Sequence, residues 1–126
     1  MAATDKVRAE EFQVVTALSV ADIRAAVLES VEDARRALVS SMVVEDTGDG
    51  IDVIERGPGG LVKRLWITIH WSDSDDGRHV KLAVTDVLLV QDRIFWFIPF
   101  GPKTAPALGT LRRFCSAFRS RLDARA

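Results

Sequence analysis

Few side chains of this sequence have the types and spacing that chemistry requires, and Asp86 is the first of them. It falls in the run 78–90, RHVKLAVTDVLLV, where it occupies the apolar side of an otherwise regular alternation. A carboxylate in that place is costly unless it is paired, protonated, wetted or displaced by a β-bulge. Three interpretations follow: a bulge or solvent-exposed twist, a structural pair with an arginine, or a cavity carboxylate that orients a ligand or serves as a general base.

The two histidines lie beside an acidic turn. His70 and His79 are expected on the outward faces of two successive strands, on either side of the turn 73–77, DSDDG. Imidazoles and aspartates can hold a divalent metal, but this spacing is not diagnostic of zinc, and the turn is shorter than a calcium loop. We assign no metal ligand, no catalytic residue and no cofactor. An enzyme of cyclase type, acting through Asp86 and His70, is the weakest functional hypothesis.

Two further features predict structure rather than chemistry. The single cysteine, Cys115, excludes an internal disulfide and a Cys-based zinc site, and its place on an apolar helical stripe is typical of inert packing. The stretch 57–60, GPGG, lacks the lysine and hydroxyl residue of a phosphate-binding loop, so it predicts a turn.

The composition indicates one folded domain. The chain has 126 residues, of which 48% are hydrophobic and 28% charged, as in ordinary globular domains. A net charge of −1 disfavours a protein dedicated to nucleic acid. No stretch resembles a signal peptide or a membrane span, so we expect a cytoplasmic protein. Residues 1–10 are polar and small, and are expected to fray.

Charge is concentrated at the carboxyl end. From residue 103 onward, six basic residues and one acid give +5, so the other 102 residues carry −6. Arginine stems cover apolar surface well, which favours a solvated helix face. A binding face for an anionic partner is the alternative.

Alternation and loop chemistry predict an antiparallel sheet. The expected strands are 11–18, 41–46, 51–56, 61–72, 78–90 and 93–100, joined by short loops that favour a meander over parallel crossovers. The last strand is apolar on both sides, which indicates an interior strand or a covered edge. Apolar stripes at spacings of three and four predict helices over 20–38 and 105–122. The predicted fold is therefore α+β, a curved six-stranded meander in the order β-α-β-β-β-β-β-α with two helices on one face.

This order resembles the helix-grip arrangement of START-type and birch-pollen-allergen-like proteins, the SRPBCC superfamily. The resemblance implies a cavity between the sheet and the last helix that takes a hydrophobic small molecule. Members of that superfamily usually have a further strand and two short helices after the first strand. The single long helix expected over 20–38 would fill part of that cavity.

The first functional hypothesis is a non-enzymatic carrier of such a molecule. Its ligand-binding residues would be Leu82, Val84, Asp86, Trp96, Leu111, Cys115 and Phe118. The second is a protein-interaction module, a dimeric adaptor or chaperone-like protein, because aromatic residues on the wet face of a sheet are typical of interfaces. Its contact residues would be Trp66, His70, Phe95 and Phe97, with the basic last helix as another surface. A core filled by large side chains favours the module, and an apolar void favours the carrier.

Overall fold

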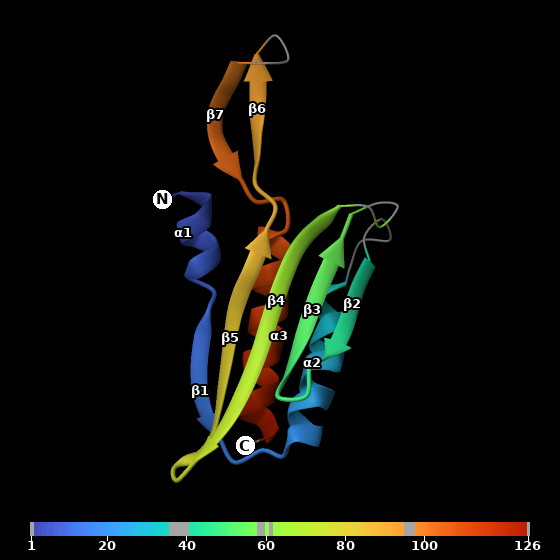
Figure 1. The fold of residues 1–126 in the computed structure, drawn as a ribbon, viewed down its shortest axis with the longest axis vertical. Coiled ribbons are helices and arrows are strands. Elements are labelled where there is room, and N and C mark those ends of the chain that lie inside the picture. Colours follow the sequence, from blue (N-terminus) through green and yellow to red (C-terminus); the bar gives the residue numbers. More distant parts are fainter. Residues whose placement is uncertain (1, 36–40, 58–59, 61, 95–97, 126) are drawn as a thin grey trace.

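The computed structural model describes residues 2–35, 41–57, 60, 62–94 and 98–125 (Figure 1). The helices are α1 (Ala3–Arg8), α2 (Val20–Ala34) and α3 (Leu108–Arg125). The strands are β1 (Phe12–Thr16), β2 (Ser41–Asp46), β3 (Gly50–Arg56), β4 (Lys63–Ser74), β5 (Gly77–Val87), β6 (Val90–Ile94) and β7 (Ile98–Thr104). All strand pairs are antiparallel, so the predicted α+β class and the pairing sense are confirmed.

Five strands form the main sheet in the order β1-β5-β4-β3-β2. Strands β2 to β5 follow one another as a meander, and β1 adds to the free side of β5. The tight turns depend on glycine, since Gly48 and Gly77 have φ of +92° and +124°, which other residues rarely adopt. In this strand order, β1 and β2 are the two edge strands of the sheet.

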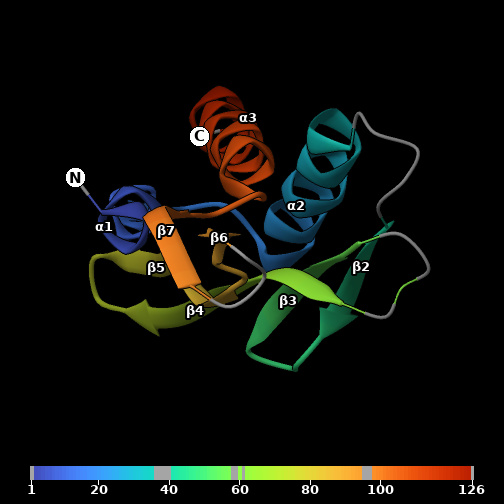
Figure 2. The same ribbon diagram turned by 90° about the horizontal axis from the view of Figure 1, so that it is seen from above.

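Helices α2 and α3 lie side by side on the same face of this sheet, as predicted (Figure 2). Helix α2 begins after Ser19, whose hydroxyl accepts a hydrogen bond of 3.1 Å from the Asp22 amide. The predicted stripe of α2 is buried, with Ile23 and Val27 fully enclosed. No helix in the described ranges is both long and apolar enough to cross a bilayer.

The core fills the space between the two layers. The inner face of the sheet contributes alternate residues of β3, β4 and β5, of which Val53, Ile67 and Val84 lie opposite one another. Phe114 and Phe118 of α3 meet this face, with ring centroids 5.9 Å apart. Both phenylalanines have no exposed surface, so α3 is the element that closes the core.

The first ten residues differ from the expectation that they fray. Residues 3–8 form helix α1, which lies beside β5 and α3. Val7 is buried in the core cluster, and the Arg8 guanidinium donates to the Val84 carbonyl at 3.1 Å. A helix this short depends on tertiary packing, which sequence periodicity does not report.

The last predicted strand also differs from the structure. Residues 93–94 and 98–100 do not belong to the meander: among the described residues, β6 and β7 pair only with each other, in a hairpin that projects beyond the sheet (Figure 1), and residues 95–97 of the predicted strand lie outside the description. Strand β5 ends at Val87, and β7 extends to Thr104, into the residues between the last expected strand and the last expected helix. An apolar run without alternation does not reveal where a chain reverses, which accounts for the error.

Candidate interaction surface

The predicted carrier site, between the sheet and α3, is packed with side chains. Leu82, Leu111 and Phe118 have no exposed surface, and Val84 and Cys115 are 3% exposed. Leu82, Leu111 and Phe118 line none of five hollows found on the described residues, whereas Cys115 borders one of them and Val84 and Asp86 border another. These side chains are therefore brought together as a hydrophobic core. Trp96, the remaining aromatic of that set, lies outside the described residues.

Asp86 is displaced from the apolar side of β5. The register between β4 and β5 shifts between Trp66 and Ile67, so Thr85 is an extra residue and Asp86 lies opposite Trp66. The Asp86 carboxylate is exposed and accepts a hydrogen bond of 2.9 Å from the Val87 amide. Of the three interpretations of Asp86, the bulge is therefore the one that applies. The Asp86 carboxylate does not line the space under α3.

The two histidines each contact a different aspartate. His70 Nδ1 lies 3.7 Å from Asp49 Oδ2, and His79 Nε2 lies 2.8 Å from Asp76 Oδ1. Hydrogen bonds from Ser74 and His79 lower the pKa of Asp76. In the described part of the chain, no group of three or more His, Cys, Asp or Glu side chains converges as metal ligands would.

His70 and Asp86 are not brought together as an acid–base pair. His70 lies four residues along β4 from Trp66, the partner of Asp86, a separation of about 13 Å along the strand. Proton transfer between positioned groups requires hydrogen-bond reach. The geometry therefore offers no support for the cyclase hypothesis.

Most of the basic charge on α3 has partners within the molecule. Arg121 bonds Glu29 at 3.0 Å and Asp33 at 2.6 Å, both on α2. Arg113 donates to the Ala34 carbonyl, and Arg119 lies over the Phe12 ring, 4.8 Å from its centroid. These arginines connect α3 to α2 and β1, as a solvated structural face would.

The outer face of the sheet carries an apolar row that crosses three strands. Val43 of β2 lies opposite Ile54 of β3, which lies opposite Trp66 of β4. We call these three residues the Trp66 row. Val43 is 44% exposed and Trp66 is half-buried, so the row reaches the surface on the side away from the helices. Among the described atoms, the indole Nε1 of Trp66 is buried without a hydrogen-bond partner.

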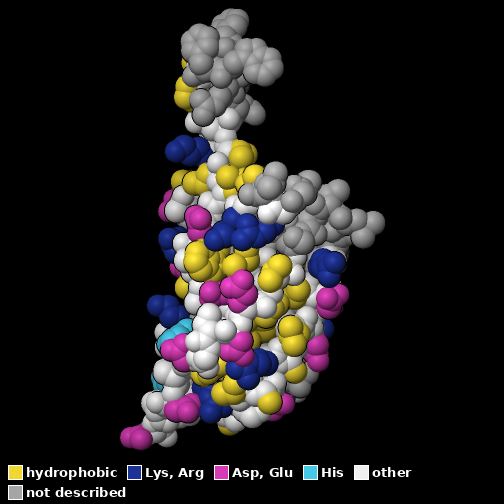
Figure 3. Space-filling view, turned by 45° about the vertical axis from the view of Figure 1, so that its right-hand side comes forward, with side chains coloured by type: hydrophobic (Ala, Val, Ile, Leu, Met, Phe, Trp, Pro, Cys, Tyr) yellow, Lys and Arg dark blue, Asp and Glu magenta, His cyan; other side chains and the backbone are white. Residues whose placement is uncertain are grey.

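Charges of opposite sign lie on the two sides of the Trp66 row. The Lys63 ammonium lies 4.1 Å from the centroid of the Trp66 ring, towards the end of the sheet where β4 begins. Glu45 and Asp52, which lie opposite each other on β2 and β3, follow on the other side. Figure 3 shows apolar side chains on this side of the molecule, with basic and acidic side chains around them.

The sequence predicted part of this surface. Trp66 and His70 are on the outer face, as expected, whereas Phe95 and Phe97 lie outside the described residues. The contributions of Val43 and Ile54 were missed, because they depend on the pairing register of three strands. The turn 47–50, TGDG, indicates in the sequence how β2 and β3 pair, because a tight turn fixes the register of the two strands that it joins.

Comparisons with known proteins add no relative: no family model, no curated protein and no solved structure matches this chain. The resemblance to the SRPBCC superfamily therefore stays a prediction.

Proposed function

We propose that this chain is a protein-interaction module, a small adaptor that self-associates through the outer face of its sheet at the Trp66 row. The observation that carries the proposal is the large aromatic side chain of Trp66 on the solvent side, continuous with the exposed Val43. Aromatic residues in partly desolvated positions supply much of the affinity of interfaces. The packed interior supports a module over a carrier, because Leu82 of the sheet and Leu111 and Phe118 of α3 have no exposed surface.

The charge pattern favours a second copy of the chain as the partner. A two-fold axis along the Trp66 row would exchange the basic and the acidic sides of the row. Lys63 on β4 of one copy would then lie on the same side as Asp52 on β3 of the other, while the apolar rows meet at the centre. A two-fold contact of this kind uses the same patch twice and is closed.

The oligomeric state tests the proposal. We expect the wild-type chain to sediment as a dimer, and Trp66→Ala to weaken dimerisation by about thirtyfold or more, because loss of a central aromatic costs about 2 kcal/mol or more. Leu28→Ala is the matched control, since Leu28 is a large apolar side chain, 52% exposed, on α2 and therefore on the other side of the sheet. A monomeric wild-type chain, or a Trp66→Ala variant that dimerises as tightly as the wild type, contradicts the proposal.

A charge-exchange experiment tests the orientation. Lys63→Glu and Asp52→Lys should each weaken self-association, since each places like charges across the interface. Mixing the two variants should restore a heterodimer. Analytical ultracentrifugation with one labelled variant measures this directly, and recovery of neither partner would reject the two-fold arrangement.

A further inference from the structure

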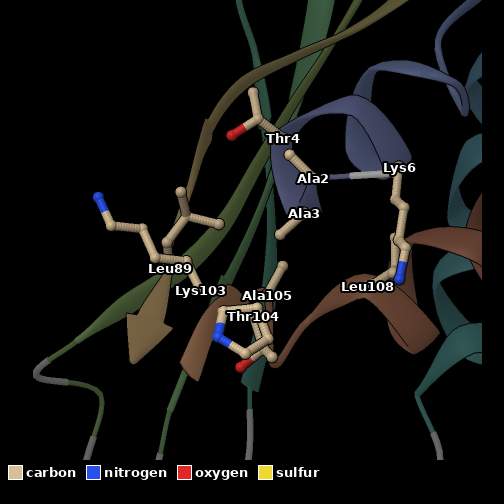
Figure 4. A pocket seen from close by; sticks show the side chains of 10 residues that line it. Ala2, Ala3, Thr4, Lys6, Leu89, Lys103, Thr104, Ala105 and Leu108 are labelled. Atoms are coloured by element: carbon tan, nitrogen blue, oxygen red, sulfur yellow. The ribbon is translucent and has the colours of Figure 1, made fainter. Parts of the chain in front are cut away.

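A hollow outside the Trp66 row has the walls of a small-molecule site. It lies between the start of α1, the end of β7 and the start of α3, and its volume is about 530 Å³ (Figure 4). This size is within the range of sites that enclose small ligands. Its walls are mostly apolar, with Ala3 of α1 and Ala105 on opposite sides, and Leu89 and Leu108 further along.

Of the described residues that line this hollow, two are charged, and both are lysines. Lys6 and Lys103 are exposed at its borders and make no ion pair within the described part of the chain. No aspartate or glutamate is among the lining residues. An apolar hollow bordered only by positive charge complements a ligand with an apolar body and an anionic head.

We propose that this hollow binds a small amphipathic anion, an aliphatic carboxylate. Its chain would occupy the space between Ala3, Ala105 and Leu108, and its headgroup would lie at the border beside one of the two lysines, which Figure 4 shows at opposite ends of the hollow. The hollow is separate from the Trp66 row, so the proposal is independent of self-association. It also differs from the carrier hypothesis, which placed a ligand under α3.

The first test is calorimetric titration of the full chain with dodecanoate below its micelle concentration. We expect saturable binding of one dodecanoate per chain, and no comparable binding of dodecyltrimethylammonium, which has the same chain and the opposite charge. The Lys6→Gln/Lys103→Gln variant should bind dodecanoate about tenfold or more weakly, the effect of about 1.4 kcal/mol. Lys81→Gln is the control, because Lys81 is an exposed lysine on the outer face of β5.

A second variant tests the location. Ala105→Phe should abolish binding by filling the hollow, and Ala3→Leu on the opposite wall does the same if Ala105→Phe fails to fold. Absence of saturable binding, equal binding of the cationic chain, or wild-type affinity in the double lysine variant or in a folded filling variant overturns the proposal. Co-sedimentation with anionic vesicles that excess dodecanoate does not reduce would assign the lysines to a membrane surface and also overturns it.

Discussion

Whether a side chain of β5 is buried or exposed depends on the local pairing register of the strand. Asp86 interrupts an apolar alternation, yet one extra residue at the bulge turns it to solvent opposite Trp66. The same local shift preserves the burial of Val84, which is 3% exposed. A bulge therefore avoids the desolvation of a carboxylate without loss of a core position.

Cys115 provides a prediction at this scale. Burial raises the pKa of its thiol from 9.0 to about 12, so the thiolate is scarce in the native state at any moderate pH. We expect N-ethylmaleimide to react with the native chain far more slowly than with the chain unfolded in denaturant, as followed by mass spectrometry. Equal rates in the two states would contradict this burial.

The same shift has a consequence for stability in alkali. Because the folded pKa is the higher one, the unfolded thiol ionises first as the pH rises above 9.0 towards about 12. The contribution of Cys115 is fully present below this window and is lost across it. The Cys115→Ala variant has no thiol to ionise at this position. Its unfolding free energy should therefore fall less steeply than that of the wild type over the same pH range.

Short elements at the ends of the chain depend on partners that lie far away in sequence. Helix α1 forms against the core through Val7 and Arg8, whereas the β6–β7 hairpin projects with no third strand. A two-stranded hairpin alone is marginally stable in water. The hairpin therefore belongs to the less stable part of the molecule.

The turn between β4 and β5 gives the prediction for an element. Gly77 has φ of +124°, and a Cβ there would lie 3.2 Å from both the Thr16 carbonyl oxygen and the Val15 side chain of β1. Gly77→Ala should lower the unfolding free energy by about 1–2 kcal/mol for the backbone conformation, with a further cost for crowding. Urea denaturation measures the difference.

Gly48 is the matched control for this turn. It also has a positive φ, +92°, but a Cβ there would meet nothing within 4 Å. Gly48→Ala should therefore cost only the backbone component. Equal losses at Gly48 and Gly77 would show that the approach of β1 to the turn does not constrain it.

At the scale of the whole molecule, the distinction between carrier and module depends on how the layers pack. Phe114, Phe118 and Leu111 of α3 fill the space above the sheet, so the interior contributes stability and the surfaces are left for binding. The Trp66 row and the hollow beside α1 lie on different parts of that surface.

Truncation of Phe118 tests this packing. Phe118→Ala should lower the unfolding free energy by about 3–5 kcal/mol, a large part of the stability of a small domain. The control Val15→Ala, at a side chain 50% exposed on β1, should change it by about 0.5 kcal/mol or less. A loss near that of the control would indicate that Phe118 borders free space, as a carrier requires.

The residues alone determined the class of the fold, the antiparallel sheet, the helix that begins after Ser19 and the amphipathic stripe of α3, because these follow from local periodicity and capping. Only the tertiary structure decided that α1 folds against the core, that β6 and β7 form a separate hairpin, and that the Asp86 side chain lies on the exposed outer face of the sheet. The tertiary structure also determines which residues lie together at the two proposed sites. The Trp66 row and the hollow join residues far apart in sequence, and such contacts depend on register and packing, which no local pattern specifies.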